Sequence, residues 1–126
     1  IETRNQNYLN KRYFEFLQTM KLSHVFLQGY WMPSIFQVYE RFKDYIKNHT
    51  VIRLHGSDRK GIERKTRNKW NTIVEPKDHD LNKLKSMVNE LIARKIKVTL
   101  NVNNHYEGSA PKTIDRFLKL FLKGSG

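Results

Sequence analysis

The sequence predicts an α/β fold of four parallel βα units, equivalent to the C-terminal half of a (βα)8 TIM-like barrel. Short β-rich runs alternate with longer segments whose apolar residues recur at helical spacing, and the connections between them are short. Strict alternation of this kind implies parallel strands joined by right-handed crossovers, with helices covering the sheet. A complete barrel has about 250 residues, so this chain of 126 residues corresponds to half of one.

The first predicted unit begins at the start of the chain. Residues 1–4 alternate like the end of a strand, and residues 8–21 carry apolar side chains at helical spacing, with Asn5 or Asn7 as N-cap. Residues 24–28 form the second predicted strand. A flavodoxin-like sheet is the alternative fold, but it needs a glycine-rich phosphate loop after the first strand, and none is present there.

The middle of the chain contains the next helix and the third strand. Ser34 and Gln37 have the spacing of a capping box, which predicts that a helix begins there. Residues 50–55 form the third strand, and Gly56 ends it. Residues 57–71 are rich in Arg and Lys, and their pattern fits a loop or a short helix equally well.

The last predicted units follow this basic segment. Asp78 and Asp80 stand where negative charge complements the dipole of a helix, and an apolar stripe follows them. Residues 97–103 form the fourth strand, after which comes an apolar helix. We expect one domain over residues 1–123, with residues 124–126 as a flexible tail or a remnant of an expression vector.

The chain is strongly basic, with 24 Lys and Arg against 12 Asp and Glu and a formal net charge of +12. Such a charge attracts polyanions, although lysines spread over helical faces also serve solubility alone. The absence of cysteine excludes disulfides and thiolate chemistry. Because no apolar run is long enough for a membrane helix and no signal peptide is evident, we expect a cytoplasmic protein with no membrane partner.

Polar side chains stand near the carboxyl end of every predicted strand. Side chains alternate along a strand, so each strand has two sets that point to opposite faces. If the apolar sets pack under the helices, the polar residues converge on the C-terminal mouth of the barrel, where barrel active sites lie. These residues are Glu2, Arg4, Gln28, Arg53, His55, Asn101 and Asn103.

Two interpretations fit these polar residues. In the first, Arg4 and Arg53 clamp an anion while His55 or Glu2 acts as an acid or a base. In the second, Glu2 pairs with an arginine in a buried ionic layer, because buried charges need partners. A histidine alone at a strand end is more often structural than catalytic, whereas one beside an arginine fits either role.

The turns after the third and fourth strands contain Gly56 and Gly108. In a barrel such turns hold phosphate through backbone N–H groups, although glycine that only permits a turn is the simpler explanation. Glu2, His55 and His105 together would make a two-histidine, one-carboxylate site for a divalent metal. We do not favour this metal site, because sequence spacing does not show that the three residues converge, and the sequence identifies no cofactor.

Residues 59–70 form a basic segment that contains six Arg or Lys residues and ends in Trp70. This mixture can grip phosphates and stack a base, which makes nucleic-acid binding an alternative function. The simpler interpretation has Trp70 as a core anchor and the cations in solvent.

Four segments resemble one known family: Ile1-Glu-Thr-Arg4, Val51-Ile-Arg-Leu-His-Gly56, Trp70-Asn-Thr-Ile-Val-Glu-Pro76 and Val102-Asn-Asn-His-Tyr-Glu-Gly-Ser-Ala-Pro111. They are similar to the YecE-like family, a domain of unknown function (family seventy-two). The resemblance implies a (βα)8 barrel about twice this length, of which the chain would be the C-terminal half. It implies no established activity. By the family pattern the site residues would be Glu2, Arg4, Arg53, His55, Gly56, Asn103, Asn104 and Gly108.

We therefore expect an anionic or phosphorylated small molecule to be bound, or acted on, at the mouth of a TIM-like barrel. The expected acid and base residues are His55 and Glu2. The expected anion-binding residues are Arg4, Gln28, Arg53, Gly56, Asn101, Asn103, Asn104 and Gly108. The alternatives are a nucleic-acid module and a structural half-barrel that assembles with a partner. Since half a barrel exposes its inner face, we expect a missing N-terminal half or a second copy of the chain to cover it.

Overall fold

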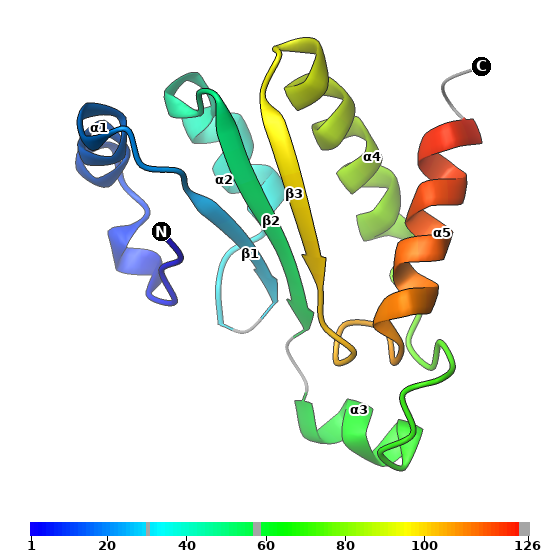
Figure 1. Cartoon of the computed structure of the whole chain (residues 1–126). Coiled ribbons are helices and arrows are strands. Elements are labelled where there is room, and N and C mark those ends of the chain that lie inside the picture. The colour runs from blue at the N-terminus through cyan, green and yellow to red at the C-terminus, as the bar shows by residue number, and fades with distance from the viewer. Residues whose placement is uncertain (30, 57–58, 124–126) are drawn as a thin grey trace.

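The computed structural model contains one parallel sheet of three strands within the residues that it describes (Figure 1). The described residues are 1–29, 31–56 and 59–123. The strands are β1 (Val25–Gly29), β2 (His49–Gly56) and β3 (Lys97–Val102). β2 lies between β1 and β3, and both pairings are parallel, with Phe26 beside Ile52 and Ile52 beside Leu100. The predicted mixed α/β class with parallel strands is confirmed.

Five α-helices and two short 3-10 helices complete the described part of the chain. The α-helices are α1 (Lys11–Met20), α2 (Ile35–Phe42), α3 (Arg59–Thr66), α4 (Asp78–Ala93) and α5 (Ala110–Lys123). The 3-10 helices are η1 (Gln6–Tyr8) and η2 (Lys43–Tyr45). In Figure 1, α2 and α4 lie behind the sheet, α1 lies beyond β1, α5 lies beside α4, and α3 lies below the carboxyl ends of the strands. No described helix has the length and hydropathy that crossing a bilayer requires.

One face of the sheet is covered by helices and the other carries no helix among the described residues; we refer to the second as the open face (Figure 1). Ile52 and Leu54 point to the covered face and are at most 1% exposed. Burial of each such side chain contributes about 1.5 to 3 kcal/mol to stability. Leu27, Arg53 and Asn101 are aligned across the three strands and alternate with these core residues, so they point to the open face.

The structure has three strands where the sequence predicts four, because residues 1–5 form no strand. The carbonyl oxygen of Ile1 accepts a hydrogen bond from the backbone N–H of Val25 (2.9 Å), so this segment touches β1 without forming a ladder. The side chain of Asn5 accepts from the backbone N–H of Asn7 (2.9 Å) and caps η1. The chain therefore turns immediately after the alternating residues, and the described part contains three complete βα units rather than four.

The other predicted elements are present, with boundaries that differ by a few residues. α1 starts later than predicted because Asn10 is its N-cap, with Oδ1 accepting from the backbone N–H of Tyr13 (2.9 Å). Ser34 caps α2 as predicted, accepting from the backbone N–H of Phe36 (3.3 Å). The ambiguous basic segment contains α3. The predicted tail, residues 124–126, lies outside the described residues.

Candidate functional site

Two arginines and one carboxylate meet at the open face, and we refer to Glu2, Arg4 and Arg53 as the arginine cluster. Nη1 of Arg53 donates to both carboxylate oxygens of Glu2, at 3.2 and 3.4 Å. Nε of Arg4 donates to Oε2 of Glu2 at 3.4 Å. Two guanidinium groups against one carboxylate leave a formal charge of +1. The arginine cluster therefore favours an anion at the open face.

The arginine cluster is not a buried ionic layer. The side chains of Arg4 and Arg53 are 42% and 36% exposed, and that of Glu2 is 21% exposed. Ion pairs this exposed contribute about 0 to 1 kcal/mol to stability, because water and salt screen them. The ion pairs of the arginine cluster therefore contribute little to folding stability.

A depression of about 340 Å³ lies beside the arginine cluster, at the carboxyl ends of β2 and β3. Its lining residues are Arg53, Asn101, Val102, Asn103, Asn104 and Ala110. Arg53 belongs both to this depression and to the arginine cluster. Asn101 is the register partner of Arg53 on the neighbouring strand. Guanidinium and amide N–H groups on adjacent strands are suitable donors to the oxygens of a phosphate or a carboxylate.

His55 lies at an irregularity of β2. Leu54 pairs with Gln28 and Gly56 pairs with Gly29, so the register between β1 and β2 skips His55. Simple alternation therefore does not determine the direction of this side chain, and such bulges often re-aim a side chain next to a site. Nδ1 of His55 lies 3.2 Å from the carbonyl oxygen of Gly56.

Gln28 lies on the covered face and not with Arg53. Its Nε2 donates to Oδ2 of Asp80 at 3.1 Å, and its Oε1 accepts from the backbone N–H of Ile35 at 3.0 Å. The hydroxyl of Tyr106 donates to the same Asp80 oxygen at 2.8 Å. Burial and the neighbouring carboxylate raise the pKa of Tyr106. Gln28 thus joins the starts of α2 and α4, which is a structural role.

Gly56, Gly108 and Asn104 shape the turns after the strands. The φ angles of Gly56 and Gly108 are 92° and 118°, and a Cβ on either would lie 2.5 or 2.6 Å from a backbone carbonyl oxygen. Only glycine tolerates this conformation and this close approach. Oδ1 of Asn104 accepts from the backbone N–H of Ala110 (2.7 Å) at the start of α5. Turn geometry alone accounts for all three residues.

His105 links α3 to the end of β3. Its Nε2 lies 3.2 Å from Oε1 of Glu63, and its Nδ1 lies 3.3 Å from Oδ1 of Asn103. The indole ring of Trp70 packs against the imidazole, with ring centroids 4.7 Å apart. Nε of Arg59 donates to Glu63 at 3.0 Å, and the hydrogen bonds from Arg59 and His105 lower the pKa of the Glu63 carboxyl.

Metal ligands do not converge in the described part of the chain. No group of three or more His, Asp or Glu side chains there is placed to hold a metal ion. The carboxylate of Glu2 accepts hydrogen bonds from Arg53, and the imidazole of His105 contacts Glu63 and Asn103. The metal site considered from sequence, with Glu2, His55 and His105 as ligands, therefore finds no support in this geometry.

Comparison with known proteins assigns nearly the whole sequence to one family. The family model described as "Protein of unknown function DUF72" matches residues 1–125. The chain belongs to this family. No curated protein and no solved structure gives a significant match. Membership of DUF72 confirms the resemblance to a domain of unknown function without naming a reaction, so the site in this DUF72 chain has to be interpreted from its own contacts.

The DUF72 chain also contains a buried carboxylate that sequence reasoning missed. Glu107 is 0% exposed and accepts hydrogen bonds from the backbone N–H of Lys77 (2.7 Å), the hydroxyl of Thr113 and Nη2 of Arg116 (3.1 Å). No pattern distinguishes Glu107 from an exposed loop carboxylate, because Lys77 is 30 residues away along the chain. Glu63 was missed as well, although it is the one acidic residue in the basic segment, and that was a usable signal.

Proposed function

We propose that the open face of this DUF72 chain binds an anionic, phosphate-bearing small molecule beside the arginine cluster. The observation that carries the proposal is the position of Arg53, which pairs with Glu2 and also lines the depression at the ends of β2 and β3. Arg53 and Arg4 supply positive charge, and the amides of Asn101 and Asn103 supply further donors. Glu2 is a positioning residue, because its carboxylate accepts from both guanidinium groups.

The contacts of the arginine cluster leave room for a ligand. A guanidinium group has five N–H donors, and the contacts of Arg53 with Glu2 use the donors on Nη1 alone. The side chains of Arg53 and Arg4 are more than a third exposed, since their values are 36% and 42%. An anion can therefore bind to Arg53 without breaking the contacts of Arg53 with Glu2.

The proposal includes an enzymatic role for the same surface. His55 is the next-to-last residue of β2, the strand that bears Arg53, and histidine is the side chain most often used as a general acid or base. We propose His55 as the acid or base group acting on the bound molecule. We further propose that this surface is the mouth of a TIM-like barrel completed by chain that is not part of this sequence. Three parallel strands with helices on one face support this arrangement.

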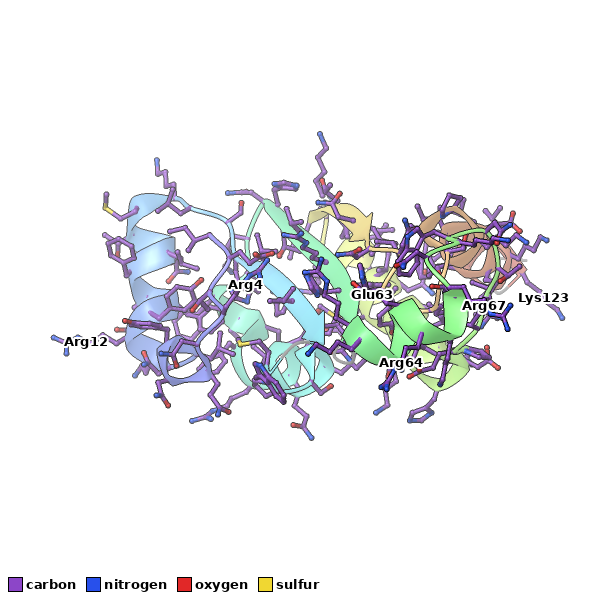
Figure 2. All side chains as sticks on the ribbon, turned by 90° about the horizontal axis from the view of Figure 1, so that it is seen from below. Arg4, Arg12, Glu63, Arg64, Arg67 and Lys123 are labelled. Atoms are coloured by element: carbon purple, nitrogen blue, oxygen red, sulfur yellow. The ribbon has the colours of Figure 1, made fainter. Side chains whose placement is uncertain are left out.

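Isothermal titration calorimetry tests the proposal with inorganic phosphate, glucose 6-phosphate and adenosine monophosphate as probes. At least one probe should bind saturably to the unaltered chain. Arg53→Gln should weaken that binding by about 10- to 150-fold, since a charge-assisted hydrogen bond contributes about 1.5 to 3 kcal/mol. The matched control is Arg12→Gln, which removes an exposed cation from α1, far from the depression (Figure 2).

Three results discriminate between a specific anion site at Arg53 and an effect of overall charge. Arg12→Gln should leave the affinity unchanged, and His55→Ala should also retain phosphate affinity because His55 is proposed to act on the ligand rather than to hold it. Equal losses in Arg53→Gln and Arg12→Gln would reduce the effect to overall charge. The absence of saturable binding by the unaltered chain to all three probes would remove the proposal.

A further inference from the structure

We propose that the outward side of α3 and the turn after it bind single-stranded nucleic acid, independently of the arginine cluster. The surface consists of four cationic side chains and is referred to here as the basic ridge. Its members are Lys60, Arg64, Arg67 and Lys69. All four residues are exposed.

The basic ridge differs from the other cations of the same segment in its pairing. Arg59 pairs with Glu63 at 3.0 Å, and Lys65 pairs with Glu75 at 3.1 Å. In the part of the chain that the structure describes, no carboxylate forms an ion pair with any member of the basic ridge. The positive charge of the ridge is therefore not neutralised by these residues. Solubility alone does not require such a separation of paired and unpaired cations.

The helix geometry gathers these charges into a row. Lys60 and Arg64 are four residues apart on α3, which places them on one side of the helix, and Arg67 is the first residue after α3. The one acidic residue of the segment, Glu63, lies three residues after Lys60, and its carboxylate contacts His105 at 3.2 Å and Arg59 at 3.0 Å. Figure 2 shows the side chains of Arg64, on α3, and of Arg67, just after α3, on the outside of this part of the chain. Arg67 and Asn68 have φ angles of 53° and 59°, so the chain turns there and continues to Lys69.

A row of cations fits a chain of phosphates better than a single phosphate. Seven residues of α-helix span about 10 Å, so the charges are distributed along a line rather than around a point. Trp70 follows the row directly, and it is half-buried with its ring tilted by 48° against His105. The exposed part of an indole can stack on an unpaired base. Bases in a duplex already stack on one another, so the neighbouring tryptophan favours a single strand.

Fluorescence anisotropy tests this inference with a fluorescein-labelled deoxythymidine oligonucleotide and a hairpin duplex of matched length. The ridge variant is the triple substitution Lys60→Gln, Arg64→Gln and Arg67→Gln. The control variant removes the same charge from three exposed cations outside the segment, through Arg12→Gln, Lys47→Gln and Lys97→Gln. Circular dichroism checks that both variants keep the helical content of the unaltered chain.

The expected readout is the slope of log affinity against log salt concentration. Each phosphate contact with a single strand contributes about 0.7 to this slope, so the ridge variant should lose about 2 from it while the control keeps it. Equal slopes in the two variants would overturn the inference, as would no binding to the oligonucleotide at about 50 mM salt or tighter binding to the duplex. Arg53→Gln should bind the oligonucleotide normally, which separates this inference from the proposed small-molecule site.

Discussion

At the scale of single residues, Glu107 is a charged side chain that is 0% exposed and therefore depends on its hydrogen-bond partners. A buried carboxylate is stable only when donors surround it, and here they come from Lys77, Thr113 and Arg116. Glu107→Gln puts an N–H donor in place of an acceptor and removes the charge facing Arg116. We expect it to lower the free energy of unfolding by about 3 kcal/mol in urea denaturation. Glu15→Gln, which loses only an exposed ion pair on α1, should lower it by less than about 1 kcal/mol. Similar values for the two variants would contradict the stabilising role assigned to the three hydrogen bonds that Glu107 accepts.

His24 is a second residue whose surroundings have a measurable consequence. It is 4% exposed, and its Nδ1 lies 2.9 Å from the hydroxyl oxygen of Tyr13. The rings of Phe14 and Phe26 pack edge-on against it, with centroids 4.9 and 4.6 Å away. Burial lowers the pKa of His24 from 6.5 to about 3, so the folded chain keeps this imidazole neutral.

The pKa of His24 predicts that acid weakens the fold. Between about pH 6.5 and pH 3 the unfolded chain binds a proton at His24 that the folded chain does not, so stability falls as the pH falls. We expect a loss of about 2 kcal/mol between pH 6.5 and pH 5, measured as the free energy of unfolding in urea. His24→Gln should remove this dependence, because the amide does not titrate. His79→Gln, at an exposed histidine, should retain it. An unchanged pH profile in His24→Gln would contradict the assignment.

Alternation predicted which residues lie on the open face, because side chains along a regular strand point alternately to its two faces. Arg53 and Asn101 were correctly placed together, since both lie in regular parts of neighbouring strands. The prediction that Gln28 faces the same way does not hold, because the hydrogen bond to Asp80 lets a polar side chain lie on the covered face. Partners distant in sequence, such as those of Glu107, leave no periodic pattern to detect.

At the scale of elements, α3 is held to the rest of the fold by the buried side chain of Ile62 and by polar contacts. Glu63 contacts His105 at 3.2 Å, and Lys65 contacts Glu75 at 3.1 Å. Glu63→Gln removes the charge that attracts His105 and Arg59. We expect the backbone amides of residues 59–66 to exchange with deuterium several-fold faster, while those of β2 keep their rates.

The matched control for this prediction is Glu40→Gln on α2. Glu40 also forms an exposed ion pair, with Lys43 at 3.3 Å, but this pair links residues of neighbouring turns. Its loss should leave exchange in residues 59–66 unchanged. If Glu63→Gln exchanges like the unaltered chain, then the contact with His105 does not hold α3 in place.

The elements themselves were largely predictable, because most are marked by period and by caps. The strands at residues 24–28, 50–55 and 97–103 and the helix after Ser34 are found within a few residues of their predicted positions. The predicted strand at residues 1–4 is absent, because a four-residue alternation does not reveal whether a neighbour pairs along its length. The fold class was therefore predictable from the sequence. The number of strands was not, because it depends on which segments pair with a neighbouring strand in space.

At the scale of the whole molecule, α5 exposes an apolar row. Ile114, Leu118 and Leu122 are 39%, 48% and 67% exposed. They are four residues apart, so they lie along one side of the helix. α5 also packs beside β3, which is an outer strand of the sheet. An exposed apolar row on a helix beside an outer strand of the described sheet is a surface on which another chain can bury area.

This apolar row supports the expectation that the chain associates with a second copy or with a complementary half-barrel. Sedimentation velocity of the chain alone should show species larger than a monomer that increase with concentration. Leu118→Glu places a charge in the middle of the row and should weaken association at least about tenfold, because burying a leucine contributes about 1.5 to 3 kcal/mol. Asn89→Glu adds the same charge at an exposed position of α4 and should leave association unchanged. A stable monomer at every concentration would exclude self-association, and equal behaviour of the two variants would mean that the row on α5 is not the contact.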